Sequence, residues 1–222
     1  MRITPTSELE QRIGRLQKLM VKEGFDGVAL LQNADLFYFT GSIQQGVCYV
    51  PAAGDALYLV RKDFGRARME SGLNQVVPLG SMRNVADELQ NHNIGMPQTL
   101  GMELDVLPVN LYQRWLKVFN NCEVRDISNL IRKVRAVKSD YEIDIMKDCS
   151  LMMDKVYQRA KEVIAVGKTD LEVAAEIEFL ARKEGHQGIT RFRSFNAELF
   201  YGHVFSGPDS AVPAHQDTPL GG

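Results

Sequence analysis

The stretch that most constrains the fold is GVCYVPAAGDALYLVR (46–61), which has the pattern of a β-hairpin. Two apolar, strand-like runs flank Ala52-Ala53-Gly54-Asp55, whose small and polar residues suit a turn. A hairpin holds two neighbouring strands in antiparallel order. Any sheet built on this segment is therefore not purely parallel.

Helix and strand patterns alternate around this hairpin through the first 130 residues. The segment after Pro5 predicts a helix with a capping box between Ser7 and Glu10, ended by Gly24. A single turn of helix is expected to end at Gly41. Further strands are expected at 27–32, 75–79, 99–105 and 122–127, and further helices at 82–93 and 108–119. This mixture predicts an α/β fold in which helices pack on a mixed sheet.

The pattern changes near residue 134, and we expect a domain boundary between 134 and 140. Ser139 and Glu142 form a capping box at the start of a long amphipathic helix, which we expect to end at Gly167. Thr169 and Glu172 repeat the same box before a shorter amphipathic helix. Two capped helices in succession distinguish this part from the strand-rich part before it.

Composition and charge exclude several functions. The net charge is −2 and there is no basic stripe, so a nucleic-acid partner is not expected. No apolar run approaches the ~20 residues that cross a bilayer, and the N-terminus lacks the apolar core of a signal peptide. Cys48, Cys122 and Cys149 are scattered and odd in number, which favours reduced thiols and a cytoplasmic location over a disulfide framework or a zinc site.

Several segments, in order along the chain, resemble the pita-bread metallopeptidases, the family that includes creatinase, prolidase and aminopeptidase P. LLQNADLFYFTG (30–41) and the hairpin resemble the N-terminal domain of that family. DISNLIRKVRAVKSDYEIDIMKDC (126–149) resembles the join between its two domains, with an Arg-x-x-Lys-Ser element at Arg135, Lys138 and Ser139. Two later segments resemble a helix and the SGxNxxxPH loop of the catalytic domain: GKTDLEVAAEIEFLARKEG (167–185) and SGPDSAVPAHQDTP (206–219).

The resemblance implies an α/β protein in two parts. Residues 1–137 would form a creatinase-type N-terminal domain, a mixed sheet flanked by helices. Residues 138–222 would form the N-terminal part of a pita-bread α+β catalytic domain, which is incomplete at this length. The expected architecture is therefore one whole domain followed by a fraction of a second.

His215 is the catalytic residue that the resemblance assigns, because the histidine of the SGxNxxxPH loop lies beside the metal centre and contacts substrate in relatives. Two departures from the family pattern are present. Asp209 replaces the usual asparagine, and Ala214 is inserted between Pro213 and His215, which changes the spacing of the imidazole. The remaining histidines are expected to be structural: His92, His186 and His203.

The resemblance also implies a chemistry for the full-length enzyme. Two divalent metal ions (Mn, Co or Zn) would acidify a bound water and polarise the scissile carbonyl. Their ligands, two aspartates, a histidine and two glutamates, would follow the SGxNxxxPH loop. The substrate would be a peptide with proline at its second position, cleaved before the proline, and the enzyme would be a homodimer. We expect residues 1–222 to lack the metal ligands and to be inactive alone.

Two other functions stay open. Relatives that have lost the metal ligands bind peptides or partner proteins without catalysis, and creatinase-like relatives hydrolyse small amides. Arg191 and Arg193 in TRFRSF fit either a contact to a substrate carboxylate or a solvated strand face, and the second interpretation is preferred.

Overall fold

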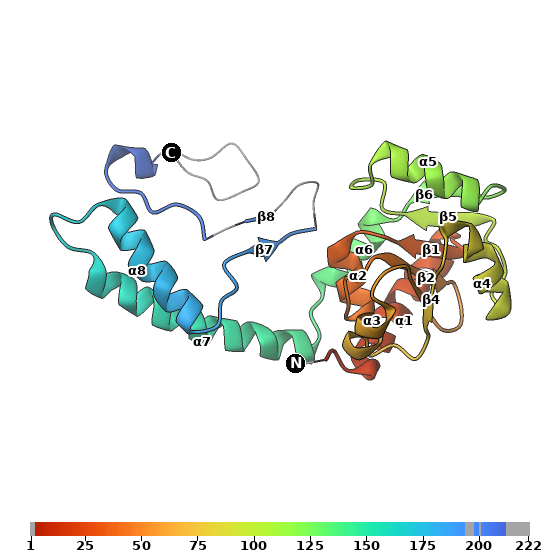
Figure 1. Ribbon diagram of the computed structural model, residues 1–222, viewed down its shortest axis with the longest axis horizontal. Helices are drawn as coiled ribbons and strands as arrows, with labels where there is room; N and C mark the ends of the chain where they lie inside the picture. Colours follow the sequence, from red (N-terminus) through yellow and green to blue (C-terminus); the bar gives the residue numbers. More distant parts are fainter. Residues whose placement is uncertain (1–2, 194–197, 200, 212–222) are drawn as a thin grey trace. The chain divides into compact units, whose positions relative to one another are not determined.

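The computed structural model describes residues 3–193, 198–199 and 201–211, which divide into two compact units (Figure 1). The first unit contains the chain up to Val137 and also the short segment that begins at Arg193. The second unit begins at Lys138. The division therefore falls where the hydrophobic pattern of the sequence changes.

A six-stranded sheet forms the centre of the first unit, in the order β4-β3-β2-β1-β5-β6 (Figure 1). Its strands are β1 (Gly27–Leu30), β2 (Gly46–Pro51), β3 (Leu57–Val60), β4 (Val76–Pro78), β5 (Thr99–Met102) and β6 (Glu123–Asp126). β2 is antiparallel to both β1 and β3, whereas the pairs β1–β5, β3–β4 and β5–β6 are parallel. The hairpin and the mixed α/β sheet are thus confirmed, and all strands except β2 end at the same edge.

Helices cover both faces of this sheet. They are α1 (Thr6–Glu23), α2 (Asn33–Thr40), α3 (Phe64–Glu70), α4 (Val85–Asn91), α5 (Val109–Val118) and α6 (Ser128–Ala136), with a 3₁₀ turn η1 (Met82–Asn84) before α4. Successive side chains of the buried strands point alternately into two apolar clusters, one on each face of the sheet, because side chains in a strand have a period of two. Val28 and Leu30 pack in the cluster with α1, α2, α3 and α6, while Ala29 packs in the cluster with α4 and α5.

The start of α1 differs from the expected capping box. Pro5 is the N-cap, the helix begins at Thr6, and no side chain caps it, so the Ser7–Glu10 box is wrong. The Thr6 hydroxyl donates instead to the carbonyl of Gly72 at 2.7 Å, a long-range contact at the start of the helix, which begins two residues earlier than the Ser7 box would place it. The expected helix stop at Gly24 is confirmed, because this residue takes the left-handed conformation with φ of 73°.

The second unit consists of α7 (Asp140–Val163), α8 (Asp170–Lys183), a small antiparallel pair and a 3₁₀ turn η2 (Pro208–Ala211). The pair is formed by β7 (Thr190–Arg191) and β8 (Glu198–Leu199). Both expected capping boxes are present, at Ser139 and at Thr169. α7 ends at Val163, four residues before the expected end at Gly167.

Two properties of the whole described chain bear on function. All three cysteines are free thiols, as the sequence predicted. Within the described residues, no helix combines the length and the apolar character needed to cross a bilayer.

Candidate functional site

Acidic side chains gather where the parallel strands β1, β5 and β6 end. This is the edge at which parallel sheets place their binding and catalytic groups. We call the group the carboxyl-edge cluster, and it consists of Asp35, Glu103, Asp105, Asp126, Ser128, Arg132, Arg135 and Arg193. All of these residues belong to the first compact unit.

Asp35 is the most deeply buried charge of the carboxyl-edge cluster. It lies in the first turn of α2 with a side chain that is 0% exposed. Arg135 donates from Nη1 to one of its oxygens at 3.0 Å, and Arg193 donates from Nε to the other at 2.6 Å. A buried carboxylate without partners would be strongly destabilising, so these two arginines are what allows Asp35 to occupy this position.

Glu103 follows β5 directly and is also fully buried. Its side chain accepts hydrogen bonds from the backbone N–H groups of Leu31 (2.7 Å) and Gln32 (3.0 Å). Burial, the charge of Asp35 and a side-chain hydrogen bond with Asp35 raise the pKa of Glu103 well above its usual value, and the two backbone donors only partly oppose this. Because Asp35 is paired with two arginines, the proton of this bond resides on Glu103.

Asp105 has the opposite electrostatic behaviour. Arg193 donates to it from Nη1 at 2.6 Å and from Nη2 at 3.1 Å, and the Ser128 hydroxyl and Arg132 each donate at 2.5 Å. Burial raises its pKa, but the hydrogen bonds from Arg193 and Ser128 and the arginine charges outweigh burial and hold the pKa below its usual value. Asp105 is therefore an ionised anchor.

Arg193 bridges the carboxylates of Asp35 and Asp105, so the interpretation of this residue made from the sequence is wrong. Its side chain is 6% exposed, so the solvated strand face expected for it is wrong. Asp35 and Asp105 together use Nε, Nη1 and Nη2, and a substrate carboxylate would have to displace one of them. The side chain of Arg191 lies outside the described structure.

The carboxyl-edge cluster is an anchoring arrangement and does not resemble a catalytic one. Asp35 and Asp105 are matched by arginines. The neutral carboxyl group of Glu103 is matched by backbone donors, and Asp126 accepts from the N–H groups of Leu104 and Ser128. Sequence reasoning missed Asp35, Glu103 and Asp105 altogether. Their signal was available, because Glu103 and Asp105 lie at the carboxyl end of the strand expected at 99–105, where polar residues of a parallel sheet converge.

The predicted catalytic residue, His215, lies outside the described residues, as do Pro213 and Ala214. The other three histidines make contacts that suit structural roles. His92 is the C-cap of α4, with Nδ1 2.8 Å from the carbonyl oxygen of Glu88, and the Gly188 N–H donates to His186 Nδ1 at 2.9 Å. His203 lies in a loop, although the apolar pattern of FYGHVF (200–205) predicts a strand, and its ring is 5.3 Å from that of Phe205.

Carboxylates, imidazoles and thiolates are the side chains that bind metal ions in proteins. Among the described residues, no group of three or more His, Cys, Asp or Glu side chains is arranged to hold a metal ion. Of the four acidic residues in the carboxyl-edge cluster, Asp35, Glu103 and Asp105 are occupied by arginines and backbone N–H groups. Asp126 is occupied by the N–H groups of Leu104 and Ser128. The described residues therefore do not fit a dinuclear metal centre.

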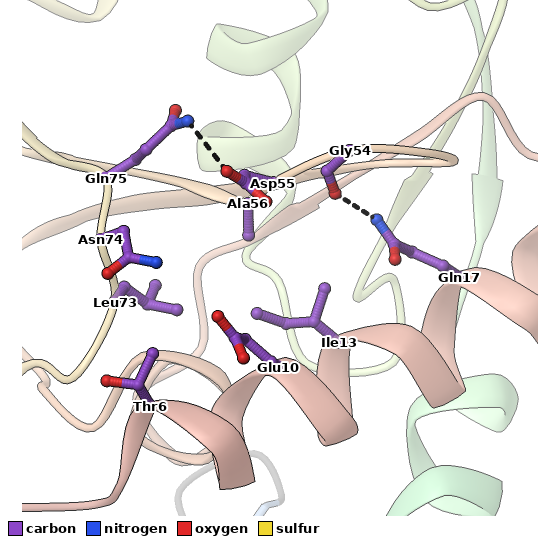
Figure 2. Close-up of a pocket in the computed structure, with 10 residues that line it drawn as sticks. All are labelled: Thr6, Glu10, Ile13, Gln17, Gly54, Asp55, Ala56, Leu73, Asn74 and Gln75. Atoms are coloured by element: carbon purple, nitrogen blue, oxygen red, sulfur yellow. Dashed lines mark hydrogen bonds between the residues drawn. The ribbon is translucent and has the colours of Figure 1, made fainter.

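A small pocket lies between α1, the β2–β3 turn and the segment before β4 (Figure 2). Its volume is about 110 Å³. Gln17 donates across one side to the carbonyl of Gly54 at 2.8 Å, and Gln75 donates to Asp55 at 3.3 Å (Figure 2). A cavity of this size holds a few waters at roughly 30 Å³ each, so it is too small to be the site of a dipeptide.

Comparison with known families now identifies the class of protein. The Creatinase/Prolidase N-terminal domain matches residues 12–137, which is more than half of the chain. The chain belongs to the creatinase/prolidase family. The family expected from the sequence is thereby confirmed, together with the mixed sheet that carries it.

Individual relatives are named peptidases. The Xaa-Pro dipeptidase of Pyrococcus furiosus is 28% identical over 179 residues, which are 80% of this chain and 49% of the relative. The crystal structure of the prolidase from Pyrococcus horikoshii aligns with a TM-score of 0.68 at 26% identity, covering 80% of this chain and 50% of that one. The Xaa-Pro dipeptidase from Bacillus anthracis shares the fold, with a TM-score of 0.72 at 24% identity over 82% of this chain and 51% of that one. The chain spans about half the length of the curated relatives it matches.

Proposed function

We propose that these residues are the N-terminal part of a proline-specific metallopeptidase, of the prolidase or Xaa-Pro aminopeptidase type. The observation that carries the proposal is the match of an Xaa-Pro dipeptidase to 80% of the chain at 28% identity. The bond before proline is a tertiary amide without an N–H, so its hydrolysis requires a site built for the proline ring. The complete protein would therefore select peptides with proline at the second position.

The two parts of the chain would have different roles. Residues 1–137 would act as the creatinase-type domain, and 138–222 would begin the catalytic domain. Support for this boundary comes from the family match, which ends at residue 137, and from the division between Val137 and Lys138. Arg135 lies in the last turn of α6 and pairs with Asp35 of α2. This pair would stiffen the first domain immediately before the join.

Catalytic groups would be supplied from outside the described residues. Two divalent ions, Mn, Co or Zn, would supply an acidified water and polarise the scissile carbonyl when bound. His215 would contact the substrate beside them. We further propose that the complete enzyme is a cytoplasmic homodimer, as the family resemblance implies.

Hydrolysis assays test this function. The product of the complete reading frame, supplied with Mn²⁺, Co²⁺ or Zn²⁺, is expected to release proline from an Xaa-Pro dipeptide and to leave the matched Xaa-Ala dipeptide intact. A chelator should abolish the activity, and His215→Ala should lower kcat. The 222-residue chain assayed alone under the same conditions is expected to be inactive.

Two outcomes would contradict different parts of the proposal. Metal-dependent cleavage by residues 1–222 alone would show that the catalytic groups are already present in this chain. Failure of the complete product to prefer proline, with any of the three metals, would rule out a proline-specific peptidase.

A further inference from the structure

A second feature at the carboxyl edge of the sheet is a hollow lined by basic side chains. Arg61, Arg83, Arg114 and Lys117 surround it, with Ser81 and Met82 also in its wall. We call it the basic hollow. Its volume is about 570 Å³, within the range of roughly 300–1,000 Å³ that small-molecule sites occupy. It lies entirely within the first compact unit.

The fold brings these residues together from three separate segments. Arg61 directly follows β3, and Ser81 comes three residues after the end of β4. The two strands are parallel, and the Leu79 N–H extends their pairing by donating to the Val60 carbonyl at 2.7 Å. Arg114 and Lys117 are three residues apart on α5 and so share one face of that helix.

The charges in the basic hollow are unmatched, unlike those of the carboxyl-edge cluster. Within the part of the chain that the structure describes, none of its four cations forms an ion pair, and no carboxylate lines the hollow. All four side chains belong to exposed residues. The chain as a whole carries a net charge of −2, so this concentration of positive charge is local. Four like charges around one hollow repel one another, and a bound anion would relieve that repulsion.

We propose that the basic hollow binds a soluble small molecule that carries two or more phosphate charges. Three of its cations are arginines, whose planar guanidinium groups match phosphate oxygens in pairs. Ser81 Oγ accepts a hydrogen bond from the Arg83 N–H at 3.3 Å, which leaves the hydroxyl proton available to an anion. The partly buried Met82 and Val118 offer apolar contact to an organic group attached to the phosphates. The proposal does not depend on peptidase activity.

Titration calorimetry with pyrophosphate and with ATP tests the proposal on the 222-residue chain. Saturable binding at one site is expected, and it should weaken as salt is added because exposed charges are screened. The variant Arg83→Gln/Arg114→Gln is expected to weaken binding at least about tenfold, since each arginine removed is a charge-assisted donor. Both residues are exposed, so circular dichroism should show an unchanged fold.

A charge-matched control separates a site from general attraction. Lys18→Gln/Lys22→Gln also removes two cations, from α1, which packs in the opposite apolar cluster from α5. This control is expected to change the affinity by less than about twofold. Equal weakening in both variants, or no saturable binding of either probe, would overturn the proposal.

Two further binding experiments distinguish a small phosphate ligand from a lipid surface and from a nucleic acid. Binding to vesicles that contain phosphatidic acid, without binding of ATP in solution, would assign the hollow to a lipid surface and overturn the proposal. Binding of a single-stranded oligonucleotide that pyrophosphate cannot displace would overturn it in favour of nucleic acid.

Discussion

Arg193 donates from Nε to the carboxylate of Asp35 at 2.6 Å, although the two residues are 158 positions apart in the sequence. The same guanidinium holds Asp105 through its two terminal nitrogens. One side chain therefore links the ends of two strands of the sheet, because Asp35 follows β1 and Asp105 follows β5. Three predictions rest on this cluster, and two more rest on the packing at two glycines and on the exposure of the cysteines.

Replacing Arg193 should destabilise the chain. In Arg193→Ala, the buried Asp35 keeps only one of its two arginines, Arg135, and Asp105 keeps Arg132 and Ser128. We expect a loss of about 3 kcal/mol in the free energy of unfolding, measured by urea denaturation. Arg193→Lys should recover only part of this loss, because an ammonium cannot bond both carboxylates with a planar fork.

Lys147→Ala is the matched control for this measurement. Lys147 pairs with Asp144 at 3.3 Å, but both side chains are well exposed, at 70% and 65%. Its removal should change the free energy of unfolding by less than about 1 kcal/mol. If Arg193→Ala changed stability as little as this control does, the anchoring role of the cluster would be wrong.

Glu103 should act as a neutral acid, and its substitutions separate charge from hydrogen bonding. Glu103→Gln keeps an acceptor for the Leu31 and Gln32 N–H groups and a donor toward Asp35, so it should be at least as stable as the native chain at neutral pH. Glu103→Ala leaves both backbone donors without an acceptor and should cost about 2–4 kcal/mol. Equal losses in the two variants would contradict the neutral form.

The pH dependence of the Glu103 variants follows from the raised pKa. The folded-state pKa lies above the unfolded value of about 4.3. The contribution of Glu103 to stability is therefore complete below pH ~4.3 and is lost as the pH rises toward the folded-state pKa. The advantage of Glu103→Gln over the native chain should grow as the pH is raised from about 4 to 8, measured by denaturation at each pH.

Two glycines should respond to alanine in opposite directions. A Cβ at Gly101 in β5 would lie 2.9 Å from Ile127 Cβ and 3.0 Å from Val28 Cγ2, so Gly101→Ala should cost about 1–3 kcal/mol through overpacking. A Cβ at Gly14 in α1 meets nothing within 4 Å, and Gly14→Ala should stabilise by about 0.5–1 kcal/mol. Thermal unfolding of the two variants checks both signs, and a destabilised Gly14→Ala would show that the assigned helix packing is wrong.

The cysteines should differ in reactivity toward a thiol reagent. Cys149 on α7 is exposed, whereas Cys48 in β2 is fully buried. Burial raises the pKa of the Cys48 thiol, which suppresses the reactive thiolate. At pH 8 we expect rapid modification of Cys149 and none of Cys48 until the chain unfolds. Cys149→Ser should remove the fast phase, and a fast phase that persists in this variant would contradict the assignment.

Features set by neighbouring residues could be predicted from the sequence. The hairpin at 46–61 and the capping boxes at Ser139 and Thr169 depend on contacts within a few positions, and all three are present. The box at Ser7 failed because a long-range bond from Thr6 to Gly72 moved the start of α1. α3 and α6 were also not predicted as helices, since each is short: α3 lies between β3 and β4, and α6 lies between β6 and α7.

The sequence by itself determined the family, the mixed sheet and the position at which the pattern changes, because these follow from local periodicity and from ordered motifs. Only the tertiary structure decided which polar side chains meet. Asp35 and Glu103 come together because β1 pairs with β5, and the basic hollow exists because β3 pairs with β4. Strand order is a non-local choice, made by burial of whole sheet faces, and no short segment of sequence encodes it.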